Sequence, residues 1–414
     1  MAGSEDVQEL LPFLLTVLVE QLGAYDLEGI SGLPEPMRPS PSQRPQVVRN
    51  PPEPCEENRI LIADLALILV ETVPPDHLSA HLDEFVSVLR ALAMDPANPE
   101  VKIKACQAIS KLSTEAPKLI HHHSEAIVRS LYSALVHKQW KVRSAAVEAL
   151  GKAMYVGVYK YNSNILEELI GFRDPNLVPI KDFYEPSTKL NYFAMLVSDR
   201  STQVREMFYT ILQEWLCRLP DRYDLESRLI PYLLSGLFDP FPEIQNACFE
   251  AVEEVGQVYE EEKEKEIRET RQYGYTEPWT CNGVMADLPL PVPFLKRPRL
   301  GARLYFRQYV RRYLTAILAE LNDWISSSRI RAANLLLALT IFSEDYMTQH
   351  TDRLLACLYR AINMRGHDEV TAQLETVTRL LGRYLEAETY ATHVETNMRV
   401  RYVIELARSE LAFM

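Results

Sequence analysis

The stretch "DRSTQVREMFYTIL", residues 199–212, contains the pattern that decides the fold. Its apolar residues Val204, Phe208 and Leu212 stand four positions apart, so they share one face of an α-helix. An acidic residue, Asp199, comes shortly before this helix. The pattern predicts at least one amphipathic helix, and it predicts a repeat architecture if it recurs along the chain.

The pattern does recur, and at a regular distance. Its successive starts differ by 41, 41, 62, 40, 86 and 40 residues, so that four of the six intervals are about 40. Paired helices repeating every ~40 to 47 residues are typical of HEAT and armadillo repeats. The sequence therefore predicts an all-α, HEAT/armadillo-like α-solenoid of about seven to eight helical-hairpin repeats, as a single solenoid over residues 1–414. The starts are Ile60, Val101, Val142, Val204, Ile244, Ile330 and Val370.

Polar residues at the junction between the two helices of a repeat have a predicted structural role. The acids expected to cap the incoming helix are Asp95, Asp199, Asp239 and Asp323. The basic residues expected to hydrogen-bond an acid of a neighbouring repeat are Arg143, Arg205 and Arg331. We interpret this ladder as part of the repeat architecture and not as a functional site.

Composition excludes several classes of protein. The formal net charge of -13 disfavours nonspecific binding to nucleic acid or to an anionic membrane. The six cysteines show no CxxC spacing and are interpreted as reduced thiols of an intracellular protein. Acids occupy the first helix where a signal peptide needs positive charge, and no apolar run approaches the ~20 residues of a membrane span. We expect a soluble, cytoplasmic protein without a nucleic-acid or membrane partner.

Three segments interrupt the 40-residue spacing. The Pro-rich loop 33–55 predicts either a flexible connection or a recognition segment for a proline-binding partner. The aromatic insertion 157–187 either packs back on the solenoid or meets a partner, because aromatic rings are costly to leave in water. The acidic helix plus loop insertion 260–300 begins with glutamates and lysines at i,i+4 spacing, which indicates an exposed, solvated helix.

Basic and aromatic residues alternate after this third insertion. Arginines between positions 297 and 312 interleave with Tyr305, Phe306, Tyr309 and Tyr313. Such a pattern is compatible with RNA binding. The acidic composition and the helical spacing of the aromatics favour an amphipathic repeat helix instead.

Candidate chemistry is sparse. "HHHSE" places histidines at 121–123, where successive helical side chains point in different directions, so at most two could share one metal ion. His77 and His81 have the HxxxH spacing of zinc peptidases, but Leu78 stands in place of the general-base glutamate. There is no phosphate-binding glycine loop and no GxSxG nucleophile elbow. We expect no enzyme, no cofactor and no metal site.

Several blocks exceed a generic HEAT pattern. "HKQWKVRSAAVEAL", "CRLPDRYDLESRLIPYLLSGLFD", "PRLGARLYFRQYV" and "ILAELNDWISSSRIRAANLLLALTIFSEDYMTQHTDRLLACLYRA" resemble the dynein axonemal assembly factor 5 family, the HEAT-repeat members of the dynein preassembly factors. The resemblance covers about residues 80 to 400. It implies a non-enzymatic cytoplasmic scaffold that helps axonemal dynein arms assemble before transport into cilia or flagella. The partners it implies are axonemal dynein intermediate and heavy chains, other dynein assembly factors and heat-shock chaperones.

The chain departs from the family pattern in two ways, at its end and in the aromatic insertion. Family members are usually longer, and this chain stops at "ETNMRVRYVIELARSELAFM", an apolar helix where a solenoid end needs a polar face. We expect either a truncated product or a chain completed by another subunit. The aromatic insertion also exceeds the family's simple turn.

The resemblance directs attention to polar and aromatic residues in the family-like turns, which we expect to be exposed. The candidate protein-binding residues are Trp140, Asp221, Arg222, Tyr223, Arg297, Arg299, Arg303, Gln349 and His350. Periodicity alone supports only a protein-binding solenoid, so a general HEAT-repeat adaptor of the phosphatase-scaffold or transport-receptor type is the alternative. A metal-dependent enzyme, the third class, would require stoichiometric bound metal.

Overall fold

The computed structural model is helical almost throughout the part of the chain that it describes. The exception is one antiparallel pair of two-residue strands, β1 (Thr280–Cys281) and β2 (Val284–Met285). No helix in the described ranges is long and apolar enough to cross a membrane. Those ranges are 4–23, 53–156, 164–170, 191–220, 222–272, 280–281, 284–285, 290–323, 325–362, 368–385, 388–392 and 394–395.

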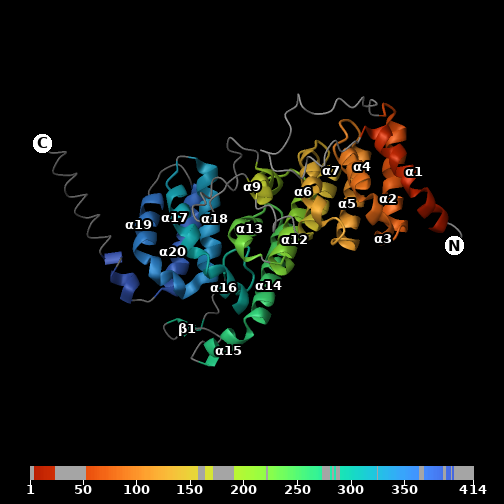
Figure 1. Cartoon of the computed structure of the whole chain (residues 1–414). Coiled ribbons are helices and arrows are strands. Elements are labelled where there is room, and N and C mark those ends of the chain that lie inside the picture. The colour runs from red at the N-terminus through yellow and green to blue at the C-terminus, as the bar shows by residue number, and fades with distance from the viewer. Residues whose placement is uncertain are drawn as a thin grey trace, which may run out of the picture. The chain divides into compact units, whose positions relative to one another are not determined.

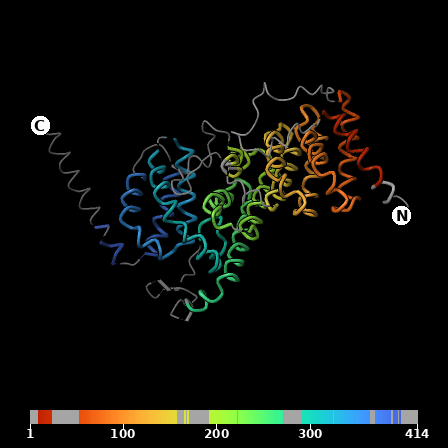
Figure 2. The backbone as a smooth tube through the Cα atoms, viewed as in Figure 1, coloured from red at the N-terminus to blue at the C-terminus, as the bar shows by residue number. Residues whose placement is uncertain are grey.

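Figures 1 and 2 show the helices in order along the chain, and their contacts divide them into two compact units. Unit 1 is Met1–Gly171 with Thr188–Ile211, and unit 2 is Phe172–Ser187 with Leu212–Met414, so the boundary falls inside α12 (Thr202–Arg218). The remaining elements of unit 1 are α1 (Ser4–Leu22), α2 (Glu56–Thr72), α3 (Pro75–Leu78), η2 (Ser79–His81), α4 (Leu82–Ala93), α5 (Pro99–Glu115), η3 (His121–His123), α6 (Ser124–Leu135), α7 (Trp140–Tyr155), α9 (Asn164–Ile170) and α11 (Tyr192–Val197).

Unit 2 contains the rest of the elements. After the second half of α12 and the two strands, its elements are α13 (Tyr223–Gly236), α14 (Pro242–Glu262), α15 (Glu264–Gln272), α16 (Leu300–Arg307), α17 (Val310–Glu320), α18 (Ser326–Ser343), η4 (Glu344–His350), α19 (Thr351–Ile362) and α20 (Asp368–Tyr384).

Each unit is built from two layers of helices. In unit 1, the second helices α2, α5 and α7 contact one another in sequence order, while the first helices α1, α4 and α6 form the other layer. In unit 2, α14, α16, α18 and α20 form the corresponding second-helix layer. Each helix therefore buries its apolar face against its neighbours in the stack, as in HEAT and armadillo repeats. The predicted all-α, HEAT/armadillo-like solenoid is confirmed.

The repeating apolar pattern lies in the core, as its spacing predicts. Val204, Phe208 and Leu212 are fully buried, and the starts at 101, 142, 244 and 370 are buried as well. Ile60 and Ile330 are only half-buried, so the register was wrong there. In α18 the buried face begins at Ser328, which is 3% exposed, two positions before the predicted start.

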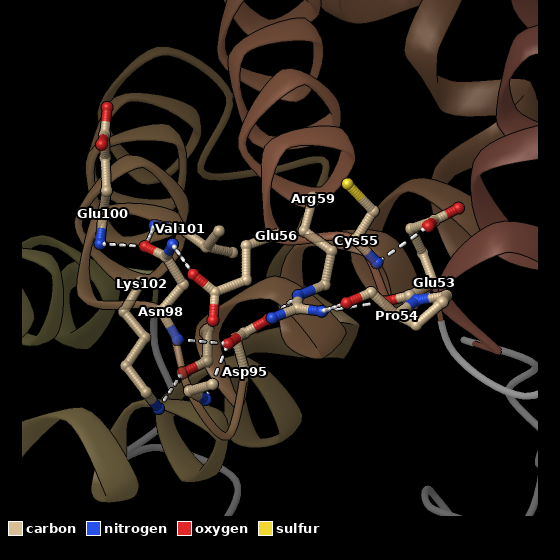
Figure 3. A network of polar contacts seen from close by, with 12 residues as sticks. Glu53, Pro54, Cys55, Glu56, Arg59, Asp95, Asn98, Glu100, Val101 and Lys102 are labelled. Carbon is tan, nitrogen blue, oxygen red and sulfur yellow. Dashed lines mark hydrogen bonds and ion pairs between the residues drawn. The ribbon is translucent and has the colours of Figure 1, made fainter.

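The junction acids hold the turn before the helix and do not cap the helix itself. Figure 3 shows the best-defined case, in which the Asp95 carboxylate accepts backbone N–H groups from Ala97 (2.9 Å) and Asn98 (2.7 Å). Asn98 is the N-cap residue of α5, since its side chain accepts from Glu100 and Val101. The capping prediction was therefore wrong by a few positions. At three other junctions the carboxylate also accepts a hydrogen bond from the backbone N–H of the residue two positions later in the chain. These acids are Asp199, Asp239 and Asp323.

Arginines connect these turns to neighbouring repeats. Arg59 of α2 forms an ion pair with Asp95 (2.7 Å), and Arg143 of α7 makes a two-pronged contact with Asp199 at 2.6 and 2.7 Å. The prediction for Arg143 is confirmed. Arg205 donates to the main-chain oxygen of Asp199, at 2.5 Å, in its own repeat. The ladder therefore joins repeats in some places and closes a single turn in others.

The described part of the third insertion contributes a helix to the core. α16 packs against α14 on one side and α18 on the other, so it occupies a place in the second-helix layer. Its approach to α14 (Figure 1) requires two glycines, because a Cβ on Gly301 would collide with the carbonyl oxygen of Gly256. The 86-residue interval thus contains a half-repeat as well as loop.

Interleaved aromatics after the insertion are buried. Tyr305 is 2% exposed and Tyr309 is 8% exposed, while Phe306 and Tyr313 are fully buried. Rings in the core are not available to stack on nucleotide bases, so the structure favours the amphipathic-helix interpretation.

Of the five cysteines whose side chains the structure describes, four are core thiols as predicted. Cys106, Cys217, Cys248 and Cys357 are free and buried, and burial raises the pKa of the Cys106 thiol to about 12. Cys55 is free but exposed, so it is not a core thiol.

Some predictions fall outside the described residues. They are most of the Pro-rich loop 33–55, the aromatic insertion 157–187 apart from α9, and the apolar stretch at the end of the chain. α9 itself packs back: Ile165 and Leu169 are fully buried, and its Glu168 carboxylate accepts from Arg129 (2.9 Å) and Tyr132 (2.8 Å) of α6. The single-domain organisation stays a prediction.

Candidate functional site: a groove along α14

The predicted site residues lie in three separate places of unit 2 and one of unit 1. Arg222 and Tyr223 begin α13, the three arginines from 297 to 303 precede and enter α16, and Gln349 and His350 end η4. Trp140 is the first residue of α7 in unit 1. Asp221 lies outside the described residues.

The candidate side chains differ in how far they are exposed to solvent. Trp140 is 41% exposed and Tyr223 is 63% exposed, as expected for contact residues. Gln349 is also exposed. His350 is half-buried, and burial together with the nearby Arg353 and Arg311 lowers the pKa of its imidazole.

Arg222 is buried, so the expectation that it is exposed was wrong. Its guanidinium contacts the carboxylates of Glu262 (2.5 Å) and Glu226 (3.3 Å) and lies 5.1 Å from the ring centroid of Tyr223. Glu226 also accepts a hydrogen bond from the Tyr309 hydroxyl. Desolvation raises the pKa of Glu226, although Tyr309 and Arg222 oppose that shift. These groups tie α13 to α14 and α17.

Arg297 and Arg303 likewise form contacts within unit 2. Both bind the Glu344 carboxylate: Arg297 at 2.7 Å through each of two nitrogens, and Arg303 at 2.9 Å. Arg303 is 2% exposed, so the expectation of an exposed contact was wrong for it, and it also donates to the Pro298 carbonyl oxygen (3.0 Å). The three side chains form a clamp, Arg297–Arg303–Glu344, that fixes the end of the insertion to the start of η4.

Arg299, by contrast, lines a groove. The groove runs along one face of α14, where lining residues recur at helical spacing from Asn246 to Glu261, and its other wall is the loop bearing Leu295, Lys296 and Arg299. Its volume is about 740 Å³. No other sequence candidate lines it.

Glutamates dominate the α14 wall. Glu253 accepts from the Arg299 backbone N–H (2.8 Å) and faces Lys296 (3.4 Å), so the two walls are held together electrostatically. The Glu250 carboxylate has no partner among the described residues, and Glu261 has only the amide of Gln257 (3.1 Å). The groove therefore carries more negative charge than its own lysine and arginine balance.

The apolar part of the groove comes from both walls. Phe249 lies 5.8 Å beneath the Lys296 ammonium and packs edge-on against Phe294, which is 1% exposed. Leu295 stands beside them with 85% of its surface exposed, and Val292, in the same loop, is 76% exposed. The groove therefore has an apolar floor, with two exposed aliphatic side chains in the loop that forms its second wall.

Sequence reasoning missed the α14 wall. The glutamates and glutamine at positions 250, 253, 254, 257 and 261 share a helical face, and that spacing was the available signal. This spacing was overlooked because the acidic run that follows it was interpreted as a solvated helix surface, and the glutamates before it were not considered separately. Within the described ranges no group of three or more side chains could hold a metal ion.

Comparison with known proteins points to one family. The sequence profile described as "Dynein axonemal assembly factor 5-like, TPR repeats" matches residues 43–171 and 187–270, together just over half of the chain. The profile described as "Dynein axonemal assembly factor 5, HEAT-repeat domain" matches residues 290–401. The helix-pair spacing of about 40 residues in both regions is that of HEAT repeats, since TPR units repeat every ~34 residues.

Curated relatives agree with these profiles. The chain is 29% identical to the dynein axonemal assembly factor 5 of Mus musculus over 350 residues, which cover 84% of this chain and 36% of the relative. It is 26% identical to that of Xenopus laevis over 384 residues, which cover 92% of this chain and 38% of the relative. The chain thus spans little more than a third of the length of these relatives.

Solved structures give weaker likenesses. The crystal structure of Kap121p bound to Nup53p is 11% identical with a TM-score of 0.36, covering 98% of this chain and 36% of that one. Computationally designed armadillo repeat proteins for modular peptide recognition are 13% identical with a TM-score of 0.32, covering 68% of this chain and 92% of theirs. Neither likeness bears on the function of this chain.

Proposed function

Because this chain belongs to the dynein axonemal assembly factor 5 family, we propose that it is a non-enzymatic scaffold for the cytoplasmic preassembly of axonemal dynein arms of motile cilia or flagella. The observation that carries the proposal is the family match, in which one profile alone covers just over half of the chain. Both outer and inner arms are included in the proposal.

The architecture supports a role in protein binding. Stacked helices offer extended surfaces on which contacts are distributed, and the described groove along α14 is open and elongated. The proposed partners are axonemal dynein intermediate and heavy chains, other dynein assembly factors and heat-shock chaperones. Exposed Trp140, Tyr223 and Gln349 remain proposed contact residues, together with Arg299 of the groove wall.

Affinity purification from the cytoplasm of cells that are building motile cilia tests this proposal. The tagged chain is recovered and the accompanying proteins are identified by mass spectrometry. Recovery of axonemal dynein heavy or intermediate chains is the expected result. Their absence, in cells shown to contain them, would contradict the dynein role.

Chaperones alone would not support the proposal, because they bind the exposed apolar segments of any unfolded chain. Val204→Asp supplies the matched control, since it places a charge at a fully buried position and is expected to unfold part of the solenoid. Dynein chains are expected with the unchanged chain and not with this variant, whereas chaperones are expected with both. Equal recovery of dynein chains with both would indicate capture by unfolded segments.

A general HEAT-repeat adaptor of the phosphatase-scaffold or transport-receptor type is the second candidate. The observation that favours it is the acid-lined groove, whose charge suits a basic partner of any origin. Recovery of phosphatase or transport factors in place of dynein chains would support this alternative.

A further inference from the structure

The groove along α14 has the dimensions and chemistry of a peptide-binding surface. It is about 740 Å³ in volume, within the range of ligand-binding clefts, and it follows four turns of one helix. Its wall residues are on the surface of unit 2, and the Arg297–Arg303–Glu344 clamp holds the facing loop in place. A surface so supported is formed before any partner arrives.

Charge selects the class of partner. Glu250 and Glu261, about three turns apart on the α14 wall, are exposed carboxylates without a cationic partner among the described residues. They are 11 positions apart on one helix, which corresponds to about 16 Å at ~1.5 Å per residue. Two cationic side chains at that separation would complement them.

An apolar anchor belongs between these two charges. Leu295 is 85% exposed and lines the groove together with Phe249, next to Glu250, and Val258, which lies between the two glutamates along α14. An aliphatic side chain placed there would remove Leu295 from water, and burial of a leucine-sized group contributes more than an exposed ion pair does.

We propose that the α14 groove binds a basic segment of a partner protein that carries two lysines or arginines with an aliphatic residue between them. In an extended segment, rising ~3.3 Å per residue, the two cations would be about four or six positions apart, because only an even spacing puts both side chains on the same face. This proposal rests on the scaffold function only for the identity of the partner, because the groove's charge and apolar floor are properties of the chain alone.

A synthetic fluorescent peptide tests the proposal on the full chain. It has two lysines about four or six positions apart and, at an even spacing from both, one leucine between them, so that all three side chains share a face. Fluorescence anisotropy is expected to show saturable binding that weakens as salt is raised, because the charges are exposed. Replacing the lysines of the peptide by glutamates is expected to abolish binding, and replacing its leucine by serine is expected to weaken it.

Variants of the chain locate the binding. The double substitution Glu250→Lys/Glu261→Lys is expected to weaken binding by about tenfold or more, because each ion pair becomes a repulsion. Glu206→Lys/Glu269→Lys makes the same charge change at exposed positions outside the groove and is expected to leave binding unchanged. Leu295→Ser is expected to weaken binding, whereas Leu61→Ser, at another exposed leucine, is not.

Several outcomes would overturn the proposal. They are no binding of the lysine peptide, equal binding of the glutamate peptide, or equal loss in the groove and control variants. A fourth is self-association in analytical ultracentrifugation that disappears in Glu250→Lys/Glu261→Lys, because the groove would then be an interface between two copies of this chain.

The failure of this proposal is distinguishable from failure of the scaffold function. If dynein chains are recovered with the unchanged chain but the peptide does not bind, the groove proposal fails and the scaffold function stands. If the peptide binds in the groove but no dynein chain is recovered, the groove proposal stands and the dynein role fails.

Discussion

Glu344 illustrates how much of unit 2 depends on single buried charges. It is 3% exposed, it binds Arg297 and Arg303, and its backbone has a φ of 48°, in a region that non-glycine residues rarely adopt. Two hydrogen bonds from Arg297 and one from Arg303 hold it where α18 ends and η4 begins. Removing its charge leaves the Arg303 guanidinium buried without its counter-ion, which is the costly way to break a buried pair.

Glu344→Gln is therefore expected to lower the free energy of unfolding by about 3 kcal/mol. It keeps the size of the side chain and leaves the backbone conformation unchanged. Urea denaturation followed by circular dichroism measures the effect. Arg299→Gln is the control, expected to cost about 1 kcal/mol or less because its ion pairs are more exposed. A similar loss in both variants would contradict the importance of the clamp.

Glu226 is expected to make stability depend on pH. Burial raises its pKa in the folded state above the ordinary value, so its contribution to stability is fully present below the unfolded-state pKa of about 4.5. That contribution is lost as pH rises through the folded-state pKa. The difference in melting temperature between the unchanged chain and Glu226→Gln should therefore shift in favour of the variant as pH rises from about 4.5. A difference that is constant with pH would refute the shifted pKa.

At the scale of elements, the contact between α14 and α16 depends on the absence of two side chains. A Cβ on Gly301 would collide with α14, and one on Gly256 would collide with the backbone of Ala302. The Gly301 N–H also donates to the Glu260 carboxylate at 2.7 Å. This close approach lets an eight-residue helix, too short to be stable alone, hold a place in the layer.

Gly301→Ala is expected to destabilise unit 2 by about 2 kcal/mol or more, because the two backbones must separate. Gly382→Ala is the matched control. Its added Cβ would approach no atom closer than 3.9 Å, and alanine in a helix is expected to stabilise the chain by up to about 1 kcal/mol. Thermal unfolding of both variants checks the opposite signs, and a stabilising Gly301→Ala would contradict the close packing.

The register of α18 gives a second prediction for an element. Ala332→Asp puts a charge at a fully buried position and is expected to cost several kcal/mol, whereas Ile330→Asp changes a half-buried position and is expected to cost less. Equal destabilisation in urea would mean that both positions face the core.

Most of the elements could be predicted from sequence, because a helix that packs in a stack repeats its apolar residues at a fixed spacing. The predicted start of the buried face of α18 was two positions too late. This helix is buried nearly all round, so it has no polar face from which the sequence could show which side meets the core. The division of the predicted amphipathic helix into α16 and α17 was missed, because the spacing of its aromatic residues gave no sign of a break. The clamp could not be predicted, since Arg303 and Glu344 are 41 residues apart and meet only after folding. The groove could not be predicted either, since its two walls, α14 and the loop with Leu295 to Arg299, come together only in the folded chain.

At the scale of the whole chain, a stack of repeats couples each element mainly to its neighbours. α12 contacts α7 where Ile211 packs over Gly151, and it contacts α14 where the Gln213 amide bonds the Glu254 carboxylate. Damage in one repeat should therefore spread over a limited distance.

Val204→Asp is expected to increase hydrogen exchange in α7, α12 and α14 by more than in α2 or α20. Mass spectrometry of peptides from exchanged protein measures this distribution. Gln203→Asp changes the exposed neighbouring position and serves as the control, with exchange unchanged. A uniform increase over the chain in Val204→Asp would indicate one cooperative core in place of a repeat stack.

The place of α16 has a consequence for the curvature of unit 2. Tyr309 and Tyr313 join α17 directly to α13, whereas α16 separates α18 from α14 in the opposite layer. One layer is therefore longer than the other by about one helix diameter, ~10 Å. Two packed layers of unequal length are expected to curve, with the shorter layer on the inner side of the curve. The loop that delivers α16 is also the second wall of the groove, so a single insertion both lengthens one layer by a helix and supplies a wall of the groove.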